Sequence, residues 1–503
     1  MQRTRKWGHI IAPGQEGQAR SLARYNAPGM TQATATSEIC FLPAAEMARR
    51  IARKELSARE VMAAHLRQLE RVNPRVNAIV TLVAEQAMEE AQRADELLAR
   101  GRIAGPLHGL PVAHKDLHDT RGIRTTYGSA LFRENVPAQN AILVERLKAA
   151  GAITIGKTNT PEFGAGSQTF NAVFGATRNP YDPSKTCGGS SGGSAVALAC
   201  GMMPIGDGSD TGGSLRNPAA FCNVVGLRPA PGRVPRHARG LAWSTLNVDG
   251  PMARTVADVA LLLSVMAGPD ARDPIAIAEP GGRFAGGLER DFEDVRVAWA
   301  GGLDGVPFAP EVRSVVDERR NIFEDLGCVV EDGQPDFRDA DEVFRTLRAW
   351  SFHTKYGELV GRHRDSVKDT VVEEVERGAR LTGPDLGRAE TLHAELFLRA
   401  QLFFEKYEYL VLPVTQVAPF DIDQPYVAEI NGIRMETYID WMKSCYYISM
   451  LGHPAISVPC GFTADGLPVG IQIVGRHEGE WSVLQLAHAF EQGTQMWKRR
   501  PAL

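Results

Sequence analysis

The sequence has few cysteines and no long apolar run, and both shortages narrow the classes of protein that it can encode. Seven cysteines are scattered over 503 residues, and none belongs to a C-x-x-C pair. An odd, dispersed set predicts neither a disulfide framework nor a zinc site, and it favours a reducing, cytoplasmic location. Because no apolar stretch approaches the roughly 20 residues that span a bilayer, we expect no transmembrane helix and no membrane partner.

A strong charge of one sign is also missing. The formal net charge is only −4, so the chain offers no electrostatic reason to bind nucleic acid or an anionic membrane. A small, largely uncharged molecule is the expected substrate. Glycine and proline are spread along the chain rather than gathered into linkers, which predicts one large domain over residues 39–503.

The first residues differ from the rest of the chain. They carry five Arg or Lys side chains against one acid before Met30, without the apolar core of a signal peptide. A transit peptide has a similar composition, but a disordered arm over residues 1–38 is the simpler interpretation. Met30 is an alternative natural start, because the ordered pattern begins only near Ile39.

Helical and strand patterns alternate through the remainder. Ser57 and Glu60 form a capping box that begins a helix, which we expect to stop at Asn73-Pro74. The further expected elements are strands over 78–82, 153–155, 410–414, 455–459 and 469–474 and helices over 85–100 and 141–150. This alternation predicts an α/β fold with a sheet covered by helices on both faces. Residues 336–408 are rich in Arg, Glu and His and predict a helical insertion.

A glycine- and serine-rich run over residues 188–219 is the most informative segment. Two Gly-Ser loops bracket the apolar stretch 195–205, which is long enough for a helix that turns into a strand. A flexible linker would be polar throughout, so the two loops are held in place. Glycines let the backbone approach a ligand and leave N–H groups free to point at a developing negative charge, as an acyl-transfer site requires.

A nucleophilic serine needs a base, and histidine is the usual one. No histidine lies between residues 180 and 230, and no G-x-S-x-G elbow is present. Upstream, His114 and His118 flank Lys115 in the segment HGLPVAHKDLHDTRG. Lys115 is the candidate base and His114 is next in line. Otherwise these histidines, and the cysteines, are expected to be supporting or core groups.

Several segments together resemble the amidase signature family. The similarity extends over about residues 56–492, and its motifs are HGLPVAHKD around Lys115, GGSSGGSA at 188–195, GSDTGGSLRNPA at 208–219, FCNVVGLRP at 221–229, GHPAISVPCGF at 452–462 and GLPVGIQIVG at 466–475. The resemblance implies amide hydrolysis on a mixed sheet surrounded by helices, with no metal and no cofactor. It also implies that the insertion shapes the substrate pocket.

Residue by residue, the resemblance makes Ser214 the nucleophile, Ser190 the bridging cis-serine and Lys115 the terminal base. The backbone amides that match the oxyanion hole are those of Thr211, Gly212, Gly213 and Ser214. The residues that match the surrounding scaffold and the substrate loop are Ser191, Asp210, Arg216 and Gly164. Lysine is a base only when neutral, so the site must lower its pKa by burial, which Asp116 would oppose if it pointed inward.

Two functions share this triad. The first is a stand-alone amidohydrolase that cleaves a small carboxamide or anilide, or a related carbamate or ester, through an acyl-serine intermediate. The second is the catalytic A-type subunit of a tRNA-dependent amidotransferase, which works only with partner proteins and charged tRNA. The N-terminal arm and the insertion favour the first. A homodimer is one assembly that the resemblance suggests. A non-catalytic binding protein on the same fold is disfavoured by the intact triad.

Overall fold

The computed structural model describes residues 38–237 and 240–503. The predicted disordered arm, apart from Glu38, and the proposed start at Met30 therefore lie outside the described residues. Within the described ranges, no helix is both long and apolar enough to cross a bilayer. All seven cysteines are buried as free thiols, as expected for small core side chains.

The described helices are distributed along the whole chain. The α-helices are α2 (Ala44–Ala52), α3 (Ala58–Val76), α4 (Ala84–Ala99), α5 (Ile142–Ala149), α6 (Gly192–Ala199), α7 (Arg216–Phe221), α8 (Val256–Met266), α9 (Pro310–Asp317), α10 (Arg320–Asp325), α11 (Ala340–His363), α12 (Asp369–Ala379), α13 (Gly383–Lys406), α14 (Lys443–Met450) and α15 (Glu480–Thr494).

Eleven of the described strands form one large sheet. Its members are β1 (Ile79–Leu82), β2 (Pro111–Lys115), β3 (Ile153–Thr158), β6 (Ile205–Asp210), β7 (Val225–Arg228), β8 (Val248–Ala253), β9 (Arg296–Trp299), β10 (Val329–Asp332), β11 (Tyr409–Pro413), β14 (Ala455–Phe462) and β15 (Pro468–Gly475). Two short hairpins lie apart from it: β4 (Phe170–Asn171) with β5 (Gly175–Ala176), and β12 (Glu429–Ile430) with β13 (Ile433–Arg434).

The strand order is β1-β3-β2-β6-β8-β7-β14-β15-β11-β9-β10. Strands β3, β2 and β6 run parallel to one another, as do β11, β9 and β10, whereas the strands between these groups pair antiparallel. The sheet is therefore mixed, as predicted. Parallel neighbours end at the same edge of the sheet, so β2 and β6 bring their final residues together.

Both faces of the sheet are covered, and two adjacent residues of β2 show it. Val112 belongs to an apolar cluster with side chains of α2, α5 and α8, whereas Ala113 belongs to a second cluster with α3 and α6. Successive side chains of a strand point to opposite faces, so the two clusters lie on opposite sides of the sheet. Lys115 follows two residues after Ala113 and is directed toward the side of α6.

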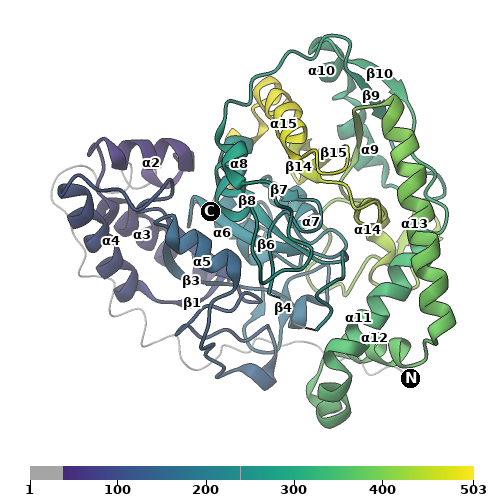
Figure 1. Cartoon of the computed structure of the whole chain (residues 1–503), viewed down its shortest axis with the longest axis horizontal. Helices are drawn as coiled ribbons and strands as arrows, with labels where there is room; N and C mark the ends of the chain where they lie inside the picture. The colour runs from purple at the N-terminus through teal and green to yellow at the C-terminus, as the bar shows by residue number, and fades with distance from the viewer. Residues whose placement is uncertain (1–37, 238–239) are drawn as a thin grey trace.

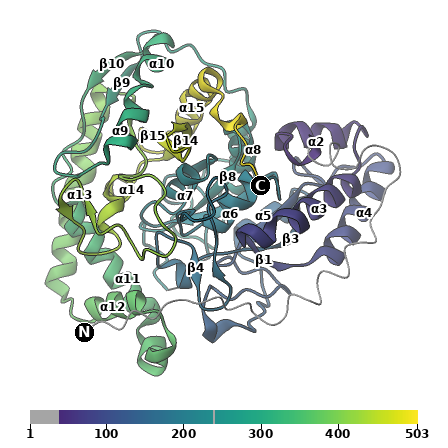
Figure 2. The ribbon, with the colours of Figure 1, turned by 180° about the vertical axis from the view of Figure 1, so that it is seen from behind.

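Two groups of helices lie at opposite ends of the molecule. Helices α2, α3 and α4 form one end, and α11, α12 and α13 form the other (Figures 1 and 2). The second group occupies the segment 336–408, in which the sequence pattern predicted helices. Whether that segment is an insertion into a single domain remains a prediction.

Most predicted elements are confirmed, with one clear error. The capping box at Ser57 begins α3, but the helix does not stop at Asn73-Pro74 and continues to Val76. Val72 and Val76 are both buried at helical spacing, so packing outweighs the single hydrogen bond that a proline removes near a helix end. Asn77 ends the helix in the left-handed conformation.

Candidate active site

A cavity of about 720 Å³ opens beside the sheet edge at which β2 and β6 end. Lys115 is the last residue of β2, and Asp210 is the last residue of β6. Ser190 precedes α6 and Ser214 precedes α7, and both serines line the cavity. The fold thus brings together segments that are separated by up to about a hundred residues in sequence.

Lys115 is completely buried and surrounded by serines. Its Nζ lies 2.8 Å from Ser190 Oγ, 2.8 Å from Ser191 Oγ and 3.0 Å from Ser209 Oγ. Every one of these partners is a neutral hydroxyl. None of these three contacts therefore places a carboxylate directly against the lysine nitrogen.

Burial lowers the pKa of Lys115 to about 7, against the raising effect of the charges on Asp249, Asp210 and Asp207. Asp116 would oppose this shift if it pointed inward, but it is not among the groups that raise the pKa of Lys115. Its carboxylate instead accepts hydrogen bonds from the backbone and hydroxyl of Thr126. Close to neutral pH, a substantial share of Lys115 is the free amine that can act as a base.

The two candidate catalytic serines lie on loops that contact each other. The Gly189–Ser190 peptide bond is cis, as the resemblance implied. The backbone N–H of Ser191 donates to the carbonyl oxygen of Ser214 over 3.3 Å, which joins the loops. Gly164 adopts a positive φ of 72°, and a side chain there would meet Leu117 and approach Ser190 Oγ. A glycine at this position leaves room above Ser190.

Asp210 fixes the loop that carries Ser214. Its carboxylate accepts the backbone N–H of Gly213 over 2.7 Å and that of Leu215 over 3.1 Å. Arg216 and Arg228 are buried against the same carboxylate. Burial alone would raise the pKa of Asp210, but the charges of the two arginines outweigh it and hold the pKa below its ordinary value.

The loop between Asp210 and Ser214 requires its two glycines. Gly213 has a φ of 122°, and a Cβ there would lie 2.5 Å from Cys445. A Cβ on Gly212 would lie 2.7 Å from the ring of Phe344, which stacks on Tyr446. Because the Gly213 amide is engaged by Asp210, the predicted oxyanion hole has the amides of Thr211, Gly212 and Ser214 left to serve it.

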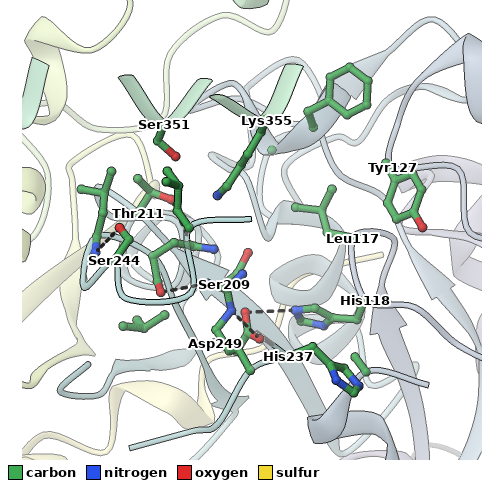
Figure 3. A pocket seen from close by; sticks show the side chains of 18 of the residues that line it. Leu117, His118, Tyr127, Ser209, Thr211, His237, Ser244, Asp249, Ser351 and Lys355 are labelled. Carbon is green, nitrogen blue, oxygen red and sulfur yellow. Dashed lines mark hydrogen bonds and ion pairs between the residues drawn. The ribbon is translucent and has the colours of Figure 1, made fainter. Parts of the chain in front are cut away.

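Beneath Lys115 lies a buried network of alternating charges. Asp207 accepts the Lys115 backbone N–H over 2.9 Å and binds His114 and His118 through their Nδ1 atoms. His118 also faces Asp249, as Figure 3 shows. Burial opposes protonation of His118, but the charges of Asp249 and Asp207 raise its pKa to about 9. His118 is thus a cation at neutral pH.

His114, the alternative base, is committed elsewhere. Its Nδ1 lies 2.6 Å from Asp207, and its Nε2 lies 3.1 Å from the hydroxyl of Thr154. A carboxylate only accepts, so Nδ1 carries the proton and Nε2 accepts from Thr154. Neither nitrogen is directed at Ser190 or Ser214, and burial lowers the pKa of His114.

One wall of the cavity is aromatic. Tyr127 meets Phe132 edge-on, Phe132 meets Phe163, and Phe163 stacks on Tyr356 of α11 with ring centroids 4.5 Å apart. Phe352 of α11 continues the row. Such a wall suits a flat, apolar group.

Sequence reasoning missed Ser209, Asp207 and Asp249 as members of the site. A signal for the first two was present, because they occupy alternate positions of the strand IGDGSD and therefore share one face. A polar pair on one face of a fully buried strand needs polar partners. Asp249 carries no such local signal, since the sheet order places β8 beside β6.

Known proteins resemble this chain over most of its length. Residues 60–484 match the family model described as Amidase. An acylamidase of Rhodococcus erythropolis is 37% identical over 465 residues, which cover 92% of this chain and 97% of that protein. The A-type subunit of the glutamyl-tRNA(Gln) amidotransferase from Moorella thermoacetica is 36% identical over 490 residues, which cover 93% of this chain and 99% of that protein.

Solved structures resemble the chain over a similar span. A bacterial aryl acylamidase of the amidase signature family superposes with a TM-score of 0.85 at 26% identity, covering 92% of this chain and 98% of that one. A 6-aminohexanoate cyclic dimer hydrolase in complex with its substrate superposes with a TM-score of 0.83 at 28% identity, covering 92% and 99%.

Proposed function

The chain belongs to the amidase family and is a hydrolase of linear amide C–N bonds, and on this basis we propose that it acts alone on a small carboxamide or anilide through an acyl-serine intermediate. The observation that carries the proposal is the 2.8 Å contact between the buried Lys115 amine and Ser190, in a cavity that Ser214 also lines.

The proposed proton path runs from Ser214 through Ser190 to Lys115. A neutral amine has two N–H donors and one lone pair. In the proposed arrangement the Lys115 amine donates to Ser191 and Ser209, and its lone pair accepts the hydroxyl proton of Ser190. Ser190 in turn accepts the proton of Ser214 while Ser214 Oγ bonds to the amide carbon. No charge has to be created on either serine before the attack.

The tetrahedral intermediate carries its negative charge on the former carbonyl oxygen. The amides of Thr211, Gly212 and Ser214 are proposed to bind it, and losing one such donor typically costs about 2.7–4 kcal/mol of transition-state stabilisation. The C–N bond then breaks, and the proton held by Lys115 returns through Ser190 to the leaving nitrogen. Water repeats the sequence on the acyl-Ser214 ester, which releases the acid and restores Ser214.

The aromatic wall supports an aryl group as one half of the substrate. Tyr127, Phe132, Phe163 and Tyr356 form a continuous row of rings along the cavity. A phenyl ring bound there would bury apolar surface and stack on the rings. An anilide or an arylcarboxamide fits this shape better than a short aliphatic amide.

The second candidate is the A-type subunit of a tRNA-dependent amidotransferase. It is supported by relatives of that name with 36% identity over 93% of this chain. The two candidates differ in what the purified chain does alone, because a component of such an assembly needs partner proteins and charged tRNA. Turnover of 4-nitroacetanilide by the isolated protein would favour the stand-alone enzyme.

The nucleophile is tested by covalent labelling. A fluorophosphonate probe should label the wild type and fail to label Ser214→Ala, whose turnover should fall by several orders of magnitude. Ser351→Ala is the matched control, because Ser351 lines the same cavity from α11 and should leave labelling intact (Figure 3). Labelling that persists in Ser214→Ala would refute the assignment.

A further inference from the structure

Beside the aromatic wall, one lysine reaches into the cavity without a partner among the described residues. Lys355 extends from α11 with its ammonium directed into the open space, as Figure 3 shows. Its side chain makes no hydrogen bond and no ion pair with any residue in the part of the chain that the structure describes. A cation that lines a cavity without a counter-ion is poised for a ligand that supplies one.

The other Arg and Lys side chains that line the cavity in the described ranges are already neutralised. Arg236 pairs with Asp249 over 3.2 Å, and Arg348 pairs with Glu374 over 2.6 Å. Arg362 pairs with Glu358 one helical turn away on the same face of α11. Lys355 is the exception among them.

The nearest charges do not serve as a partner for Lys355. Asp249 is held by Arg236 on one side and by His118 on the other, and His118 is itself a cation at neutral pH. The Lys355 side chain is exposed to the open cavity, and desolvation by the surrounding protein together with the positive charge of Arg236 lowers its pKa to about 8, which leaves it largely protonated at pH 7. The ammonium thus retains an unbalanced positive charge inside the cavity.

The position of Lys355 relates it to the substrate. It lies between Phe352 and Tyr356 in sequence, and those two side chains belong to the aromatic wall. A ring stacked on that wall would present its substituents toward α11. A negative group on such a substituent could reach Lys355 without entering the space around Ser190 and Ser214.

We propose that Lys355 selects amide substrates that carry a carboxylate away from the scissile bond. This inference rests on the proposed function, because it assigns the cavity to the amide substrate. The acid is recognised by its charge, so a primary carboxamide of the same shape should bind less well. Lys355 acts on substrate choice and takes no part in the proton transfers.

Two pairs of compounds test the inference, since the charge can lie on either half of the amide. In the first pair, 4-acetamidobenzoate carries a carboxylate on the amine half of the amide, and 4-acetamidobenzamide is its uncharged counterpart. In the second pair, 4-anilino-4-oxobutanoate carries a carboxylate on the acyl half, and its primary amide is the uncharged counterpart. In the wild type, kcat/KM should favour the carboxylate by about tenfold in at least one pair, mainly through KM, as expected for a charge-assisted hydrogen bond.

Lys355→Met should bring that ratio to about one, and Lys355→Arg should preserve part of it. Arg362→Met is the matched control, because it removes a cation from the same helix that already has a partner. The control should keep the wild-type ratio. A ratio that is unchanged in Lys355→Met, or a wild type without preference in either pair, would overturn the inference.

Failure of the proposed function gives a different result. In that case the wild type would not hydrolyse 4-nitroacetanilide, which carries no carboxylate. Binding of the four compounds to Ser214→Ala and to Ser214→Ala/Lys355→Met, measured by calorimetry, then decides the inference without turnover. Tighter binding of a carboxylate that depends on Lys355 supports it, and equal binding of carboxylate and carboxamide refutes it.

Discussion

Replacing Lys115 with methionine should change the pH dependence of stability in a direction that the burial of this amine determines. The wild-type pKa is lowered from 10.5 to about 7 on folding. Between these values the unfolded chain holds a proton that the folded protein releases, so wild-type stability rises with pH across this window. Methionine has similar length and no titrating group, and the variant should lose this dependence together with its activity.

The size of the effect follows from the two pKa values. At pH 7 the buried amine makes the wild type about 4 kcal/mol less stable than it would be if Lys115 did not titrate, and at pH 9 the deficit falls to about 2 kcal/mol. The wild type should therefore gain about 2 kcal/mol relative to Lys115→Met between pH 7 and pH 9. The variant also loses the hydrogen bonds of Lys115 to three serines, which lowers its stability at every pH. This loss is about the same at both pH values and therefore cancels in the difference.

The assay is urea unfolding of both proteins at pH 7 and pH 9, followed by tryptophan fluorescence. His118, whose pKa is about 9, titrates in both proteins and cancels in the comparison. A stability difference that stays constant between the two pH values would show that Lys115 keeps its ordinary pKa. It could not then be a base at neutral pH, and the proposed proton path would fail.

Three further outcomes are expected. Wild-type kcat/KM for a neutral anilide should rise about tenfold per pH unit below pH 7 and level off above it, as Lys115 loses its proton; a flat profile from pH 5.5 to 8 would contradict this. Arg216→Met should destabilise the protein by about 3–5 kcal/mol in denaturant unfolding, because it removes a fully buried partner of Asp210, and a loss below about 1 kcal/mol would refute that interpretation. Burial raises the pKa of Glu491 to about 8, so the folded protein keeps a proton that the unfolded chain loses, and stability falls as pH rises from about 4.5 to 8. Glu491→Gln should remove this fall, worth about 3 kcal/mol at pH 7, and an unfolding midpoint with the wild-type pH dependence would show that Glu491 is ionised in the fold.

The motifs identify segments that meet in the fold, because each motif is short and lies within one stretch of sequence. Lys115, Ser190 and Ser214 stand in segments whose glycines and spacing carry the resemblance, and the structure brings those segments to one cavity. What the sequence could not predict are the partners supplied by distant segments. Asp249 and Arg228 are examples, because strand order alone decides that they lie beside β6 or its final residue.

The fold was predictable in its alternation but not in its details. Periodicity identified α3 and its capping box, yet it could not weigh the burial of Val76 against the break expected at Pro74. The sheet order was also beyond the pattern, since strands such as β14 and β7 pair across more than two hundred residues. Short-range propensity carries no information about which distant strands meet.

Helix α11 supplies side chains that line the substrate cavity, but it supplies none of the three proposed catalytic residues. Ser351, Lys355 and Leu359 recur at intervals of four residues, and all three line the cavity. Earlier in the same helix, the ring of Phe344 packs against Gly212 of the loop that carries Ser214. A change at one of the three later positions would reshape the substrate space while the base and both serines stay on segments that α11 does not supply. Directed evolution confined to those three positions should therefore explore new amides while leaving the hydrolytic apparatus intact.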